Sequence, residues 1–128
     1  MKKGLLAHYC CSGNTIHKHS IVWVDDSKLY DIAKFAGETP HTKFYDGMLI
    51  VVASSFEPQC NLFITQLQHA LKENTELTID QAILNNKTFT SHPAIEGNDC
   101  LIYSISTIEW SSMRPTTTDA IKITLLNK

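Results

Sequence analysis

The run Met48-Leu49-Ile50-Val51-Val52-Ala53 constrains the fold more than any other stretch of the sequence. It is continuously apolar and completes a strand predicted from Lys43 to Ala53, which has an Asp46-Gly47 turn signal inside it. Such a run is typical of a β-strand that is buried on both faces. The chain therefore has to place apolar side chains on both sides of this strand.

The segments before this run also have the pattern of strands, because their apolar residues alternate or cluster in short runs between turn signals. Gly4 to Cys10 is the first strand, and Thr15 to Val24 is the second. Ser12-Gly13-Asn14 between them is a tight turn signal, so the two strands form a hairpin. Lys28 to Phe35 follows Asp25-Asp26-Ser27, another turn, and is a third strand.

The middle of the chain changes to a helical period. Its apolar residues fall on one side of a helix predicted from about Asn61 to Asn74, and they are Leu62, Phe63, Leu67, Ala70 and Leu71. A shorter helix from Leu77 to Leu84 follows, with Thr78 as its expected N-cap. We expect the two helices to lie together.

The last part of the chain returns to strands, at Cys100 to Ile105 and at Asp119 to Leu126. Strands separated from helices, without regular alternation, favour a mainly β domain of the α+β class. We therefore predict a single domain over residues 1–128. It has N-terminal strands in 1–53, two helices in 61–86 and C-terminal strands in 99–126.

Composition and charge exclude several classes of function. The chain has 128 residues and a formal net charge of -2, from scattered acidic and basic residues. This distribution disfavours nucleic acid and anionic membranes as partners. No segment approaches the roughly 20 apolar residues needed to span a bilayer. The apolar run that begins at Leu5 is far shorter than the core of a signal peptide, so we expect a cytoplasmic protein.

The four cysteines lie at Cys10, Cys11, Cys60 and Cys100, without Cys-x-x-Cys spacing. A domain of this size does not need disulfides, so we expect free and mostly buried thiols. Cys10 and Cys11 are neighbours at the end of a strand and face opposite sides, which predicts one core thiol and one exposed thiol.

Several stretches, in their order along the chain, resemble the amidohydrolases, metal-dependent hydrolases related to chlorohydrolases and guanine deaminases. The segment from His17 to Ile32 looks like the opening hairpin of that family, and Phe44 to Ile50 is similar to its lead-in strand. Asn61 to Ala70 and Leu77 to Ile83 resemble the helices after the catalytic barrel, and the stretches 98–105 and 113–122 resemble the returning strands. The resemblance implies a β-sandwich in which N- and C-terminal strands join.

The catalytic barrel of that family is missing, because eight strand-helix units take about 250 residues. Matching Ile50 onward to the last barrel strand puts Ala53 at the position of the metal-binding Asp. Matching it to the lead-in strand puts Glu57-Pro58-Gln59 at the His-x-His position. Neither alignment keeps the metal ligands, so the resemblance implies a composite domain that lacks the metal-dependent hydrolysis of the family.

His17-Lys18-His19 is the one spacing that suggests a metal, since alternate residues of a strand point to the same face. His8 or Cys10 on the neighbouring strand is a possible third ligand. An exposed hairpin face explains the same residues, and this pair does not correspond to the family's metal motif. Cys60 and His69 cannot pair as nucleophile and base, because nine helical residues separate them by about 13 Å.

The sequence therefore predicts no catalytic, cofactor-binding or metal-binding residue, and its first functional hypothesis is a non-catalytic module for association or weak ligand binding. Removal of the barrel is expected to uncover apolar surface near Phe56, Leu62, Phe63 and Leu67, which predicts a homodimer. The alternative is a small metal-dependent hydrolase that uses a His17/His19 site. A decayed fragment with no selected function is a third hypothesis.

Overall fold

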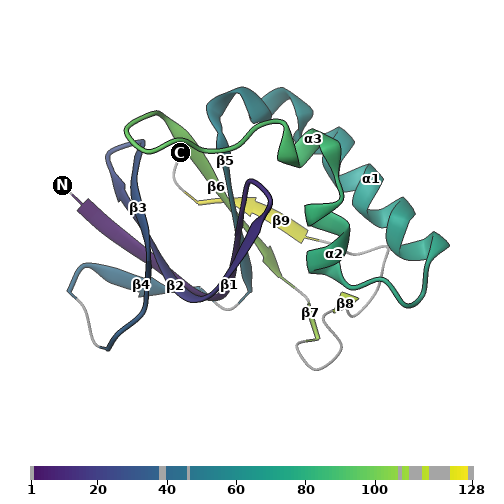
Figure 1. Cartoon of the computed structure of the whole chain (residues 1–128), viewed down its shortest axis with the longest axis horizontal. Coiled ribbons are helices and arrows are strands. Elements are labelled where there is room, and N and C mark those ends of the chain that lie inside the picture. The colour runs from purple at the N-terminus through teal and green to yellow at the C-terminus, as the bar shows by residue number, and fades with distance from the viewer. Residues whose placement is uncertain are drawn as a thin grey trace.

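A computed structural model describes residues 2–37, 40–45, 47–106, 108–109, 114–115 and 122–126 (Figure 1). The strands are β1 Lys2–Ser12, β2 Thr15–Asp25, β3 Lys28–Lys34, β4 Thr42–Phe44, β5 Met48–Ala53, β6 Cys100–Ser106, β7 Ile108–Glu109, β8 Arg114–Pro115 and β9 Lys122–Leu125. Between β5 and β6 lie a 3-10 helix, η1 Ser54–Gln59, and three α-helices, α1 Cys60–Glu73, α2 Ile79–Leu84 and α3 Lys87–Thr90. Of the described residues, 47% are in strands and 28% in helices, so the predicted mainly β class is confirmed.

The described strands form one seven-stranded mixed sheet in the order β3-β2-β1-β5-β6-β9, with β4 also paired to β1, and a separate two-stranded β7-β8 sheet. β1 is parallel to β4 and β5, and the other pairs are antiparallel. N-terminal β5 and C-terminal β6 are hydrogen-bonded neighbours, as expected for joined ends. The predicted β-sandwich is not confirmed, because these strands share one large sheet.

Both predicted N-terminal turns are present. Gly13 has φ +58, a left-handed conformation that glycine adopts without strain, and it links β1 to β2. Asp26 has φ +56 in the two-residue turn between β2 and β3, where aspartate tolerates the left-handed region better than most residues. The predicted strand around Gly47 is divided, because β4 and β5 are separate strands that both pair with β1.

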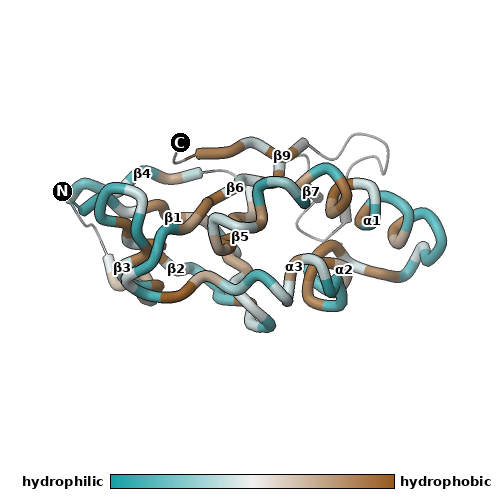
Figure 2. Tube along the Cα trace, turned by 90° about the horizontal axis from the view of Figure 1, so that it is seen from above, coloured by the Kyte–Doolittle hydropathy of each residue, from teal (hydrophilic) through white to brown (hydrophobic). Residues whose placement is uncertain are grey.

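One core lies between the helices and the sheet. β5 contributes Met48, Ile50 and Val52 to it, and β6 contributes Leu101, Tyr103 and Ile105. The helical side chains in this core are Phe63, Leu67 and Leu71 of α1, Ile79, Ala82 and Ile83 of α2, Phe89 of α3 and, from η1, Phe56. Seen from above, the helices lie at one end of the molecule and β2, β3 and β4 at the other (Figure 2).

The second core lies on the opposite face of the sheet. The alternate β5 residues Leu49 and Val51 pack there with Cys100 and Ile102 of β6 and with residues of the hairpin, which are Leu5, Ala7, Cys10, Val22, Val24 and Leu29. The strands β1 to β3 therefore curl over β5 and β6. Met48 to Val52 are all buried, which confirms the prediction that this strand packs on both faces.

The predicted helices are also present, with different boundaries. α1 begins one residue earlier than expected, after η1, and α2 has Thr78 as its N-cap with the Gln81 side chain accepting the Thr78 backbone N–H at 3.1 Å. The sequence did not predict α3, whose N-cap Asn86 accepts the Phe89 backbone N–H at 2.9 Å. Of the predicted last strand, 119–126, only 122–126 lies within the described residues.

Candidate functional site

The β1-β2 hairpin contains an irregularity at His8 and His19. Ala7 pairs with Ser20 and Tyr9 pairs with Lys18, so the two histidines between these pairs are opposite each other without a regular ladder contact. His19 has φ +48, a conformation that costs a non-glycine residue about 1–2 kcal/mol. Its carbonyl oxygen accepts the backbone N–H of Phe35 at 2.8 Å, which fixes this bend against the chain after β3.

The irregularity changes which residues of β1 face each core. Leu5 and Ala7 face the second core, and beyond His8 the residue that faces it is Cys10, an even-numbered position. Strict alternation would put residues 7 and 10 on opposite faces. Leu6, between Leu5 and Ala7, therefore faces away from the second core, toward the same side of the sheet that the helices cover at its other end.

An apolar row crosses this outer face, made of one residue from each of four strands: Phe44, Leu6, Ile21 and Ala33. Ile21 is buried, whereas Leu6 and Ala33 are half-buried and Phe44 is 50% exposed. Half-buried Trp23 follows Ile21 on the same face, directly opposite Gly4. A partly open apolar surface that includes aromatic rings is typical of an association site.

His8 and His19 border this row. The His8 ring centroid lies 5.3 Å from that of Phe44 and 6.0 Å from that of His19, and both contacts are edge-to-face. Since Phe44 is on the outer face, the two imidazoles lie there as well. His19 is exposed and His8 is half-buried.

The His17/His19 pair of the alternative hypothesis does not share one face of the hairpin. His17 is directly opposite Cys10, and Cys10 faces the second core, so His17 lies on the other face of the hairpin from His19. The left-handed backbone of His19 breaks the alternation on which the prediction depended. Within the described ranges there is no group of three or more His, Cys, Asp or Glu side chains placed to hold a metal ion.

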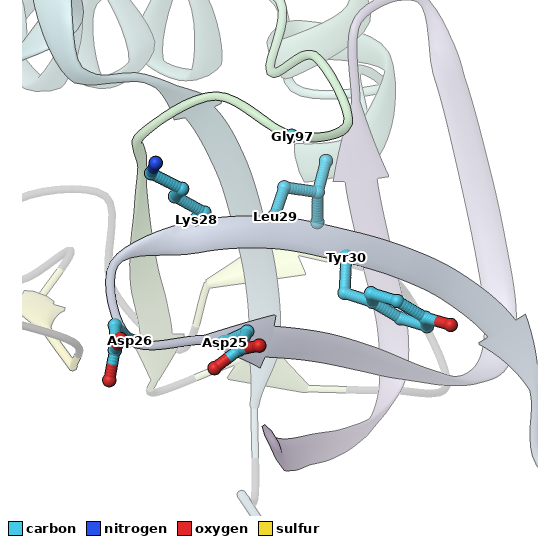
Figure 3. A pocket seen from close by; sticks show the side chains of 6 residues that line it. All are labelled: Asp25, Asp26, Lys28, Leu29, Tyr30 and Gly97. Carbon is cyan, nitrogen blue, oxygen red and sulfur yellow. The ribbon is translucent and has the colours of Figure 1, made fainter. Parts of the chain in front are cut away.

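A hollow of about 360 Å³ lies at the turn between β2 and β3 (Figure 3). Its lining residues are Asp25, Asp26, Lys28, Leu29, Tyr30 and Gly97. In Figure 3, Lys28 points toward the loop of Gly97, whereas the carboxylates of Asp25 and Asp26 point away from Lys28. Binding sites for small molecules place polar groups so that they converge on the ligand, and these charged groups diverge.

Burial keeps the thiols protonated at neutral pH. It raises the pKa of Cys10 far above its ordinary range and, with the nearby Asp80 carboxylate adding to the effect, raises the pKa of Cys11 to about 12. Burial and then Asp99 raise the pKa of Cys100 to about 11. Burial also raises the pKa of Cys60, against a hydrogen bond with Tyr103 that lowers it. A protonated thiol is a poor nucleophile.

None of the four cysteines forms a disulfide, as predicted, but neither member of the Cys10-Cys11 pair is exposed. Both are buried, Cys10 in the second core and Cys11 in the helix-covered core. The two side chains do face opposite sides. The sequence pattern did not reveal that both faces of the sheet are covered at this point.

Most of the residues predicted to form the homodimer surface are buried inside the chain. Phe56, Phe63 and Leu67 are buried in the helix-covered core, and only Leu62 is exposed, at 48%. Phe56 and Phe63 make an edge-to-face contact with 5.4 Å between centroids, so they pack on each other within the chain. The helices have folded over the sheet and buried the apolar residues that removal of a barrel was expected to uncover.

Comparisons with protein-family models, with curated proteins and with solved structures find no match for this chain. No helix in the described part of the chain is long and apolar enough to cross a membrane. The sequence reasoning missed the outer face of β1 to β4 as a candidate site. The available signal was Leu6 of β1 with Ile21 and Trp23 of β2, apolar residues at positions that alternate with those of the second core.

Proposed function

We propose that this chain is a non-catalytic association module, and that it forms a homodimer through the outer face of β1 to β4. The observation that carries the proposal is the exposed ring of Phe44 at the end of the apolar row that includes Leu6 and Ile21. A two-fold symmetric contact uses the same patch on both subunits, so one such face is sufficient. Aromatic side chains at the centre of an interface supply much of its binding free energy.

The chemistry of the thiols supports a non-catalytic role. The three buried cysteines are protonated at neutral pH, and the fourth, Cys60, has a raised pKa as well. The alternative of a small hydrolase at a His17/His19 site loses its geometric basis, because the hairpin places these two side chains on opposite faces. The free state of the cysteines supports a reducing compartment, and we place the protein in the cytoplasm.

A relationship to the composite domain of amidohydrolases is the finer part of the proposal. It is supported by one feature of the topology, which is that β5 and β6 from the two halves of the chain are paired in the same sheet. The β-sandwich of that family would need the curl of β1 to β3 over β5 and β6 to act as the second layer. An experimental structure in which residues 48–53 and 100–106 lie apart contradicts this relationship.

Sedimentation velocity at micromolar concentration, in buffer with EDTA, tests the homodimer. We expect the wild-type chain to sediment as a dimer and the Phe44→Ser variant to sediment as a monomer. Loss of an aromatic side chain on which an interface depends costs about 2 kcal/mol or more, which weakens the dimer at least about 30-fold.

The matched control is Leu62→Ser, because Leu62 is exposed to nearly the same extent, 48% against 50%, but lies on α1 at the other end of the molecule. This variant is expected to remain dimeric. A monomeric wild-type chain, or a dimer that Leu62→Ser disrupts and Phe44→Ser does not, contradicts the proposed interface.

A further inference from the structure

We propose that His8 and His19 form one half of a binding site for a divalent transition-metal ion of the zinc type, and that a second copy of the chain completes the site with the same two residues. This inference rests on the proposed homodimer. It concerns residues that the dimer itself does not require, because the apolar row lies beside the imidazoles.

The spacing of the two rings suits a shared ion. Zinc binds imidazole nitrogen at about 2.0–2.1 Å, so two rings on one tetrahedral ion have centroids about 5 Å apart. The His8 and His19 centroids are 6.0 Å apart, with the ring planes at 83°. An exposed side chain changes rotamer readily. A rotamer change that moves the ring of the exposed His19 about 1 Å toward His8 brings the two centroids to the separation that zinc requires.

The backbone conformation of His19 supports a functional role for the His8/His19 pair. His19 adopts φ +48 in the middle of a strand, where an ordinary extended residue would keep the hairpin regular. Strained backbone of this kind is concentrated at functional sites. Its effect here is specific, because it brings His19 to the same face as His8 while His17 stays on the face of Cys10.

Two imidazoles are too few for a protein zinc site, which usually has three or four protein ligands. The part of the chain that the structure describes offers no group of three suitable side chains. A two-fold axis beside the apolar row repeats the pair and supplies four imidazoles, a complete tetrahedral set. Phe44, which contacts His8, would then limit the access of water to the ion.

Zinc chloride alone is the probe, with binding measured by competition against a chromophoric chelator and the mass measured by sedimentation. The wild-type chain is expected to bind one zinc ion per two chains as a dimer. His8→Gln and His19→Asn each remove one imidazole from every chain. Asparagine is chosen at 19 because it tolerates positive φ, so that this variant keeps the hairpin. Each variant is expected to lose zinc affinity by at least about tenfold, since even an outer-shell change has that effect.

His17→Gln is the matched control, because His17 lies two residues from His19 on the same strand but on the other face. It is expected to bind zinc like the wild-type chain. No zinc binding, one zinc ion per single chain, or an equal loss in His17→Gln overturns the proposal. These outcomes are independent of the dimer test in EDTA, in which failure of the apolar interface shows as a monomeric wild-type chain.

Discussion

The two ends of the sheet carry apolar side chains on the same face, but among the described residues a cover is present at only one end. At the end of β5 and β6, the phenyl rings of Phe56, Phe63 and Phe89 are fully buried beneath the helical segment. At the end of β1 to β4, the ring of Phe44 is half exposed, beside half-buried Leu6. The comparison shows that similar apolar patterns can serve folding at one end and remain available for association at the other.

The largest effect is expected at the covered end. Phe63→Ala removes a ring that packs at 5.9 Å on Phe89 and at 5.4 Å on Phe56, between centroids, and leaves a cavity. We expect the free energy of unfolding to fall by about 3–5 kcal/mol. Urea denaturation measures it, with Leu62→Ala as control. That neighbouring side chain is 48% exposed and should cost less than about 1 kcal/mol. Equal costs would mean that the helical segment does not form the described core.

A smaller effect at the same end depends on pH. Cys11 lies in the helix-covered core, where its thiol contacts the Met48 sulfur at 3.8 Å and burial raises its pKa from 9.0 to about 12. Above pH 9 the unfolded chain releases this proton and the folded chain keeps it, so stability falls as pH rises, in a window from about 9 to about 12. Between pH 9 and 10 this thiol accounts for about 1 kcal/mol.

Urea denaturation of the wild-type chain and of Cys11→Ala at pH 8, 9 and 10 isolates this contribution. The difference in unfolding free energy between the two proteins should shrink by about 1 kcal/mol from pH 9 to 10. Cys60→Ala is the comparison variant. Burial raises the pKa of this half-buried thiol, but a hydrogen bond with Tyr103 lowers it. A difference that stays constant with pH would show that Cys11 is open to solvent.

The sequence allowed the regular elements to be predicted, but not where they are covered. The β1-β2 hairpin and helices α1 and α2 follow from local signals, which are Gly13, Thr78 and the 3.6-residue spacing of Phe63, Leu67 and Leu71. These signals extend over only a few residues, so they can be recognised in a single sequence.

The candidate site was not predictable in the same way. The left-handed conformation of His19 has no local signal, because the residues on both sides have the pattern of a strand and favour regular alternation. The burial of Phe56 and Phe63 depends on α3, a four-residue helix too short to show a period. Tertiary packing therefore decides which apolar face stays exposed. The homodimer surface predicted from the sequence lies on the face that is buried in the helix-covered core.

Helix α3 is joined to α1 by a residue whose replacement should have an intermediate effect. Asn86 caps α3 by accepting the Phe89 backbone N–H at 2.9 Å, and its side-chain amide donates to Gln66 of α1 at 2.9 Å. Asn86→Ala is expected to cost about 1 kcal/mol. Asn85→Ala, at the exposed neighbouring position, should change stability by less than about 0.5 kcal/mol. Equal losses of stability in the two variants would show that the cap of α3 does not stabilise the helical cover of β5 and β6.

The smallest effect on folding is expected at the open end. Phe44→Ser removes the ring that contacts His8 on a three-residue strand, and half of this ring is already in water, so little burial is lost within one chain. We expect the free energy of unfolding of the monomer, measured by urea denaturation at a concentration too low for association, to change by less than about 1 kcal/mol. The same substitution is expected to abolish the dimer, so one variant separates the two uses of apolar surface. A loss as large as that of Phe63→Ala would mean that Phe44 belongs to a core within the chain, and the open end would then have no surface to offer a second copy.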